Sequence, residues 1–348
     1  MAGTARRAFV ATLVGVAVIV GALALWKLRL VLSLVFLGFI IAAAMRPGIE
    51  ALKRRGIPRG VGLALHYVLL AGLVALFLWL VVPHAVTQVQ HALDKDRIRH
   101  AARSSTGIKH EVLVGLEKRL KHLPSGSKLV RPTLEVTKRA FEVAIGILFT
   151  FAIAAYWIFD RDRAIDLVAS LLPRPKRKRL RDTWDLIDAK LGAFVRGEAL
   201  LIVLVGTVLS TAFAIIGLPY WILVGSFAGI VEIVPVVGPL AAGALAVGVG
   251  FTVSWHTALA AGLVVLAVRL LEDYIVLPKV LGDATGLSPL VVLFSVSAIT
   301  ILFGGFAVLF AVPLAAVLAT LVDVLLRGRD PAEEEVPTVL FPAKDAEG

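Results

Sequence analysis

The 348-residue sequence contains no cysteine. This absence excludes disulfide bonds, thiolate metal sites and cysteine nucleophiles, and it leaves the redox compartment undetermined. Charged residues are also scarce, at 18% of the chain, against about 25% in an ordinary soluble domain. The sequence therefore does not resemble that of a soluble protein.

Complete catalytic motifs are missing as well. His110 and Glu111 begin like a zinc-protease motif, but Val114 stands where the second histidine is required. His84 and His91 could share a helix face, but without converging acidic ligands they are better explained as surface histidines. No phosphate-binding loop with its lysine is present, which argues against ATP-driven transport by this chain alone. We therefore expect no enzymatic activity, no catalytic or metal-binding residue and no cofactor.

What the sequence does contain is long apolar runs. Hydrophobic residues make up 59% of the chain and the mean hydropathy is +0.90. Runs of about 20 apolar residues cross a bilayer as helices, and they lack the alternation of spanning strands. The fold class predicted is all-α: a polytopic helical membrane protein with roughly eight spans in the lipid bilayer. The net charge of +11 lies in short segments between the runs, which fits membrane orientation and not nucleic-acid binding.

Residues 1–82 are expected to hold three spans. The runs at 9–26 and 30–45 are interrupted briefly by Lys27 and Arg29, so they are interpreted as a retained helical hairpin and not as a cleaved signal peptide. A basic loop follows, and then a third span at 61–82. With a cytoplasmic N-terminus, three crossings place the next segment outside.

Residues 83–138 are predicted to form a small extramembrane helical domain, because charged residues are frequent and apolar residues recur at three- and four-residue steps. Residues 139–326 are predicted to form a transport domain, beginning with a span at 141–159. The densest basic cluster follows at 174–181, beside an amphipathic stretch at 180–194 that is a candidate to lie along the membrane interface. Both basic clusters then fall on the cytoplasmic side. The C-terminus is predicted on that side too, with residues 327–348 as a disordered tail.

A helix break is predicted within the transport domain. Two apolar pieces, 220–234 and 240–255, are separated by a segment that includes Pro235, Gly238 and Pro239. Because proline removes a backbone donor and clashes with the preceding turn, no uninterrupted helix fits here. A broken or re-entrant helix pair is expected, and irregular backbone at membrane depth occurs where it is buried or lines a cavity. A kink that serves only packing is the alternative.

Four ionisable residues stand in apolar surroundings near this break, where unpaired charge is costly. Glu232 lies three residues before Pro235, and Arg269 lies three and four residues before Glu272 and Asp273, on one helix face. An Arg–Glu pair can neutralise itself and leave another acid to bind a proton, a monovalent cation or a small polar solute. A structural or interfacial ion network is the alternative. Gly225 and Gly229 also form a small-xxx-small pair that lets helices approach closely.

The second half of the chain resembles the autoinducer-2 exporter family of bacterial membrane proteins. The residues that carry the resemblance are 191–197, 217–220, 232–239, Glu272, 277–282, 287–290 and 312–316. The first half resembles the family in layout. The resemblance implies a multi-pass transport protein of the bacterial plasma membrane and a homo-oligomer, with a pentamer as one form. It also implies export of a small signalling molecule, or Na⁺(Li⁺)/H⁺ antiport.

The function predicted is that of a permease or secondary transporter for a small polar solute. The alternative within transport is the antiporter. An alternative of another class is a membrane-anchored scaffold that acts through its extramembrane domain. The broken helix and the acids in apolar surroundings favour transport, because an anchor requires neither.

Overall fold

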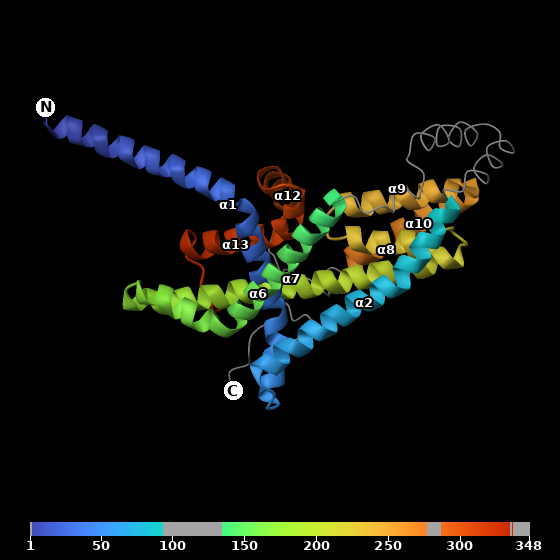
Figure 1. Ribbon diagram of the computed structural model, residues 1–348, viewed down its shortest axis with the longest axis horizontal. Helices are drawn as coiled ribbons and strands as arrows, with labels where there is room; N and C mark the ends of the chain where they lie inside the picture. Colours follow the sequence, from blue (N-terminus) through green and yellow to red (C-terminus); the bar gives the residue numbers. More distant parts are fainter. Residues whose placement is uncertain (1, 93–133, 277–286, 335, 337–348) are drawn as a thin grey trace.

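The computed structural model describes residues 2–92, 134–276, 287–334 and 336. Every regular element in this part of the chain is a helix (Figure 1). The elements are α1 (Ala2–Arg54), α2 (Arg59–Ala92), α6 (Leu134–Ser170), α7 (Arg174–Ile215), α8 (Trp221–Val231), α9 (Val237–Phe251), α10 (Trp255–Leu271), the π-helix η1 (Glu272–Val276), α12 (Pro289–Phe303), the 3₁₀-helix η2 (Gly305–Ala307) and α13 (Val308–Leu325). The predicted all-α fold is confirmed.

Five helices are long and apolar enough to cross a membrane. They are Phe9–Arg54, Arg59–His84, Phe141–Ser170, Arg174–Ile215 and Gly305–Leu325. The most apolar windows of the first two are not buried inside the molecule at all. Such exposed apolar stretches are expected where the surroundings are lipid and not water. The chain is a polytopic membrane protein.

The predicted hairpin at the N-terminus is wrong, because α1 is one continuous helix of 53 residues, about 80 Å long. No glycine or proline separates the two apolar runs, so nothing ends the helix there. The charge that suggested a turn is accommodated on the helix surface. Arg29 places its guanidinium over the ring of Trp26, 4.6 Å from the centroid, and donates to the carbonyl of Leu302 at 3.3 Å.

Figure 1 shows that α1 changes direction partway along its length. The hydroxyl of Ser33 donates to the carbonyl of Arg29 at 2.7 Å, a contact of the kind that bends helices. The cytoplasmic location predicted for the N-terminus and the outside location predicted for residues 83–138 both assumed two membrane crossings in this region. Both locations therefore remain predictions. Most of the predicted 83–138 domain lies outside the described residues; α2 continues through its start to Ala92, and α6 begins at Leu134.

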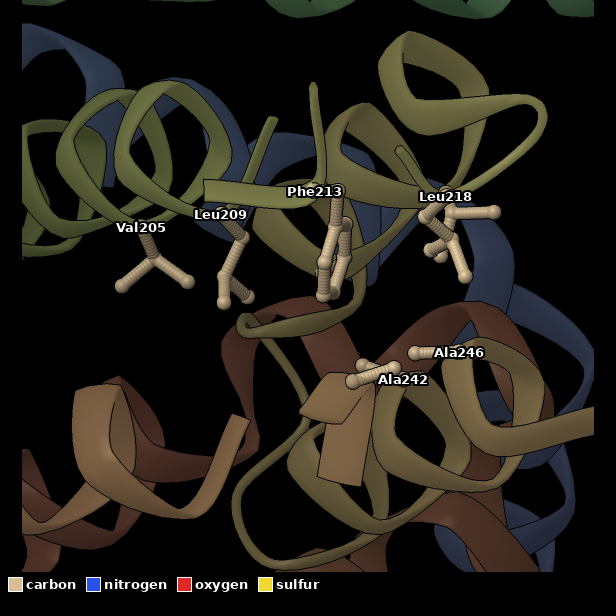
Figure 2. Close-up of a cluster of buried hydrophobic side chains, with 9 residues drawn as sticks. Val205, Leu209, Phe213, Leu218, Ala242 and Ala246 are labelled. Carbon is tan, nitrogen blue, oxygen red and sulfur yellow. The ribbon is translucent and has the colours of Figure 1, made fainter. Parts of the chain in front are cut away.

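Two hydrophobic cores share α7, which has 42 residues and packs against α1, α6, α8, α10 and α13. The first half of α7 contributes Ile187 and Leu191 to a core with α1, α12 and α13. The second half contributes Val205, Leu209 and Phe213, which face Ala242 of α9 (Figure 2). Helix α7 therefore connects the two packed regions of the protein.

Helix α8 lies unusually close to α7. A β-carbon added at Gly225 would come within 2.2 Å of the Ser210 hydroxyl, and one added at Gly229 within 2.6 Å of the carbonyl oxygen of Ile202. Both distances are far below ordinary contact, so only glycine fits at these positions. The close approach predicted from Gly225 and Gly229 is confirmed.

An ion-pair network ties α1, α6 and α7 together. The buried guanidinium of Arg161 on α6 contacts Asp185 and Asp188 of α7, and Arg46 of α1 contacts Asp188 at 3.3 Å. Buried charges require such partners. This network joins the end of α1 to the first half of α7, the two elements that carry the predicted basic regions.

The first residues of the C-terminal tail are held in place. Arg327 and Arg329 pair with Asp323. Further along, Glu334 binds the ammonium group of Lys190 on α7 at 2.5 Å, and that ammonium also donates to the hydroxyl of Thr320 at 3.3 Å. The side chain of Lys190 is only 8% exposed. The disorder predicted for residues 327–348 therefore does not extend over 327–334.

Candidate functional site

The predicted helix break lies between α8 and α9. These helices have 11 and 15 residues, about 16 and 22 Å in length, and each is shorter than the hydrocarbon core of about 30 Å. They contact each other and lie side by side in Figure 1. The pair therefore folds back on itself as a re-entrant hairpin.

Four consecutive features of the local sequence and backbone produce this turn. Pro235 cannot continue α8, and its carbonyl accepts from the amide of Val237 at 2.7 Å. Val236 takes a φ of 68°, a strained conformation for a β-branched residue of the kind that clusters at functional sites. A β-carbon at Gly238 would lie 1.9 Å from the carbonyl oxygen of Val231. Pro239 stands in the first turn of α9, where its missing amide costs no helical hydrogen bond.

The other half of the site comes from the end of α10. There the helix loosens into the π-helix Glu272–Val276, a rare form that is frequent at functional sites. Pro278 follows in the sequence and disfavours helical geometry in the residue before it. The predicted connection at 278–288 lies largely outside the described residues. The widened turn carries Glu272 and Asp273 at its start.

The structure brings all four predicted ionisable residues together around the guanidinium of Arg269. One terminal nitrogen of Arg269 lies 2.9 Å from a carboxylate oxygen of Glu232 and 3.3 Å from one of Glu272. Its other terminal nitrogen and its Nε lie 2.8 and 3.1 Å from the two carboxylate oxygens of Asp273. Glu232 therefore reaches α10 from the helix break, across 37 positions in sequence.

Carboxylates outnumber cations in this acidic cluster, a name used below for Glu232, Arg269, Glu272 and Asp273. Arg269 supplies one positive charge against three negative charges, a net charge of −2 when every group is ionised. The side chains of Glu232 and Glu272 are 8% and 5% exposed, whereas Arg269 and Asp273 are 31% and 38% exposed. The uncompensated charge thus belongs to the buried pair of glutamates.

A further glutamate, which the sequence pattern did not single out as a site residue, faces the same place. Glu198 of α7 lies close enough to Glu232 and Glu272 for their charges to repel. In sequence it marks only the end of a charged segment before an apolar run, as a residue at a membrane boundary does. Glu232 and Glu272 lie 34 and 74 positions later in the sequence, so no helical spacing connects Glu198 to them. Only the packing of α7 could reveal that it belongs to the same place.

The carboxyl groups of Glu232 and Glu272 are close neighbours, because both contact the same terminal nitrogen of Arg269. An ionised carboxylate only accepts, so two carboxyl groups share a hydrogen bond when one of them carries a proton. The arrangement is thus able to hold a proton between two elements. Within the described ranges, no group of three or more histidine, aspartate or glutamate side chains is placed to hold a metal ion.

Comparisons with known proteins extend over most of the chain. A family model described as "AI-2E family transporter" matches residues 13–327. "Putative transport protein YrrI" of Bacillus subtilis (strain 168) is 27% identical over 324 residues, 86% of this chain and 89% of that protein. "Putative transport protein MT0215" of Mycobacterium tuberculosis (strain CDC 1551 / Oshkosh) is 27% identical, with 87% and 85% covered. "Putative permease PerM" of Escherichia coli (strain K12) is 22% identical, with 64% and 63% covered.

Proposed function

Because the chain belongs to the AI-2E transporter family and is a membrane transport protein, we propose that it is a secondary transporter for a small polar solute, with the acidic cluster as the site that takes up a proton or a monovalent cation. Glu232, Glu272 and Asp273 are the candidate binding residues, with Glu232 and Glu272 as the pair that would take up the ion, and Arg269 holds all three in place. Glu198 adds to their negative charge from α7.

The observation that carries this proposal is the charge imbalance at the cluster. A purely structural network in apolar surroundings is expected to balance its charges, because each unpaired charge is costly. Here two nearly buried glutamates share one nitrogen of a single guanidinium. A proton or a monovalent cation would reduce the imbalance, and its release would restore it. Such a group can respond to an ion gradient.

The re-entrant hairpin supplies the complementary part of the site. Helix ends leave backbone groups without intrahelical partners, and α8 ends where α9 begins, beside Glu232. Broken helices of this kind bind substrates and coupling ions in secondary transporters. Pro235, Gly238 and Pro239 shape this backbone, so we assign them a structural part in binding.

The second candidate is exchange of Na⁺ or Li⁺ for protons. The approach of Glu232 and Glu272 to the same nitrogen of Arg269 favours it, because a proton or a cation held between the two carboxyl groups would exclude the other. In that case the cluster alone accounts for transport, without an organic solute.

A flux assay on the wild-type protein in liposomes separates the two candidates. Vesicles that contain a pH-sensitive dye are given an outward or inward Na⁺ gradient, with Li⁺ and K⁺ in parallel. An antiporter alkalinises or acidifies the lumen according to the direction of the Na⁺ gradient, without any solute. A solute transporter responds only when a polar solute is added. If none of the ions or polar solutes tested moves under any gradient, both candidates are wrong.

We further propose that the protein lies in the bacterial plasma membrane as a homo-oligomer, with the C-terminus on the cytoplasmic side. The contacts of Arg46 with Asp188 and of Lys190 with Glu334 support the last point. They join the C-terminal tail and the basic end of α1 to the half of α7 that begins with the basic cluster, and basic segments stay cytoplasmic.

A further inference from the structure

The turn between α6 and α7 exposes large apolar side chains. Leu167, Val168 and Leu171 are 69%, 48% and 80% exposed. Leu167 and Val168 lie in the last turn of α6, and Leu171 directly follows the last residue of that helix. Leu167 and Val168 belong to the candidate span Phe141–Ser170, but five charged residues at 160–166 separate them from its apolar run at 141–159. Crossing of the hydrocarbon core by that run does not account for their exposure.

Basic side chains surround the same turn, and most of them are engaged within the protein. Arg177 donates to the carbonyls of Ser170 and Leu172, and Arg181 makes two hydrogen bonds to Asp166. Arg179 donates to carbonyl groups near the C-terminal end of α13. These contacts hold the turn in shape.

Two other basic side chains at the turn make no such contacts. Arg174 and Lys176 are exposed, and neither side chain makes a hydrogen bond or an ion pair with any part of the chain that the structure describes. They extend from the first turn of α7, directly after the connecting segment 171–173 that includes Leu171. The turn lies at the periphery of the molecule (Figure 1). A partner that satisfies this surface must therefore carry negative charge next to hydrocarbon.

The turn between α1 and α2 provides a contrast. It is also basic, with exposed Lys53 and Arg55, but Leu52 and Ile57 beside them are only partly exposed. No large hydrophobic side chain from Arg46 to Gly60 is exposed. Charge alone is present at the α1–α2 turn, whereas charge and apolar surface occur together at the α6–α7 turn.

We propose that the α6–α7 turn is a binding surface for anionic phospholipids of the surrounding membrane. Leu167 and Leu171 enter the boundary between headgroups and acyl chains, and Arg174 and Lys176 bind the lipid phosphates. Helical surfaces that combine apolar and basic residues bind anionic membrane surfaces in this way, and basic side chains near such a surface each add to the attraction. The turn would then rest on one leaflet and fix the tilt of α6 and α7.

The test uses the purified full-length protein in neutral detergent. Phosphatidylglycerol, phosphatidylcholine or inorganic phosphate is added, and the thermal unfolding midpoint and the lipid retained in native mass spectrometry are measured. We expect phosphatidylglycerol to raise the midpoint and to be retained, and the other two to do neither. The double variant Arg174→Gln/Lys176→Gln should retain phosphatidylglycerol on the order of tenfold less, and Leu171→Gln should also weaken retention.

The matched control is Lys53→Gln/Arg55→Gln, which removes the same charge from the α1–α2 turn and should leave retention unchanged. Equal losses from the two double variants would show a diffuse effect of charge and would overturn the proposal. Retention unaffected by Arg174→Gln/Lys176→Gln would also overturn it. A midpoint raised equally by inorganic phosphate would identify an anion site instead of a lipid surface.

Discussion

Arg269 is the residue on which the acidic cluster depends, because its guanidinium contacts Glu232, Glu272 and Asp273. Arg269→Gln should lower the free energy of unfolding by roughly 1–3 kcal/mol, less than for a fully buried pair because Arg269 is partly exposed. Denaturation in detergent would measure the change. Arg163→Gln, which affects an exposed pair with Asp160, should change stability by about 0.5 kcal/mol or less. Equal effects of the two substitutions would contradict this view of the cluster.

Gly238 should tolerate no larger residue, because an added β-carbon meets the carbonyl oxygen of Val231 at 1.9 Å. Gly238→Ala is expected to destabilise the protein by at least about 1–3 kcal/mol and to abolish transport. Gly248→Ala, in the same helix but with open space around it, should be neutral or slightly stabilising. Thermal unfolding and flux would be measured together. A stable and active Gly238→Ala variant would show that the turn between α8 and α9 differs from the one described.

The residues of the site were predictable to different degrees. Glu232 and Arg269 stand out because a charge in an apolar run must have a partner, and the spacing of Glu272 from Arg269 places both on one face. Glu198 gives no such indication, because it adjoins Arg196 and Gly197 where a charged segment ends. Its part in the site results from the path of α7, which local sequence does not encode.

At the scale of elements, α1 is the helix that most needs a direct test. Spin labels at Val14→Cys and Met45→Cys would be separated by about 46 Å along a continuous helix, somewhat less across its bend. The cysteine-free background makes such labelling specific. Electron paramagnetic resonance would measure the separation. The predicted hairpin would bring these positions within about 15 Å, and that distance would contradict the structure.

The break between α8 and α9 was predictable while the continuity of α1 was not, for one physical reason. Pro235 and Pro239 remove backbone donors and restrict φ, so they end helices in any environment. Lys27 and Arg29 retain their backbone hydrogen bonds and can place their charges on the helix surface, as the stacking of Arg29 on Trp26 shows. Charged residues within an apolar run are thus weaker evidence for a turn than prolines, which remove backbone hydrogen bonds.

At the scale of the whole molecule, the pair Lys190–Glu334 joins the end of the described chain to α7. Glu334→Gln leaves the nearly buried Lys190 without a charged partner among the residues described, and should lower the free energy of unfolding by roughly 1–3 kcal/mol. Lys190→Met combined with Glu334→Gln should recover much of this loss, because no buried charge remains. Denaturant titration of the wild type, Glu334→Gln and the double variant measures these changes in the free energy of unfolding. A double variant less stable than Glu334→Gln alone would contradict the role given to this pair.

The helical membrane fold followed from composition, and the use of α7 by two cores did not. Apolar runs report which segments enter lipid, but small residues such as Gly225 and Ala246 report only that some helix can come close. Which helix packs against these small residues depends on the tertiary arrangement of all the helices. The sequence therefore predicted the class of protein and the helix break at which we place the candidate site, whereas the gathering of three glutamates from three elements required the structure.

The most direct test of the acidic cluster is the flux of protons and Na⁺ in liposomes that contain wild type, Glu232→Gln or Glu142→Gln at equal protein content. Glu142 is an exposed glutamate near the start of α6, so its substitution controls for the loss of one negative charge. We predict at least a tenfold loss of flux with Glu232→Gln, and wild-type flux with Glu142→Gln. Unchanged flux with Glu232→Gln would contradict the claim that transport depends on this cluster.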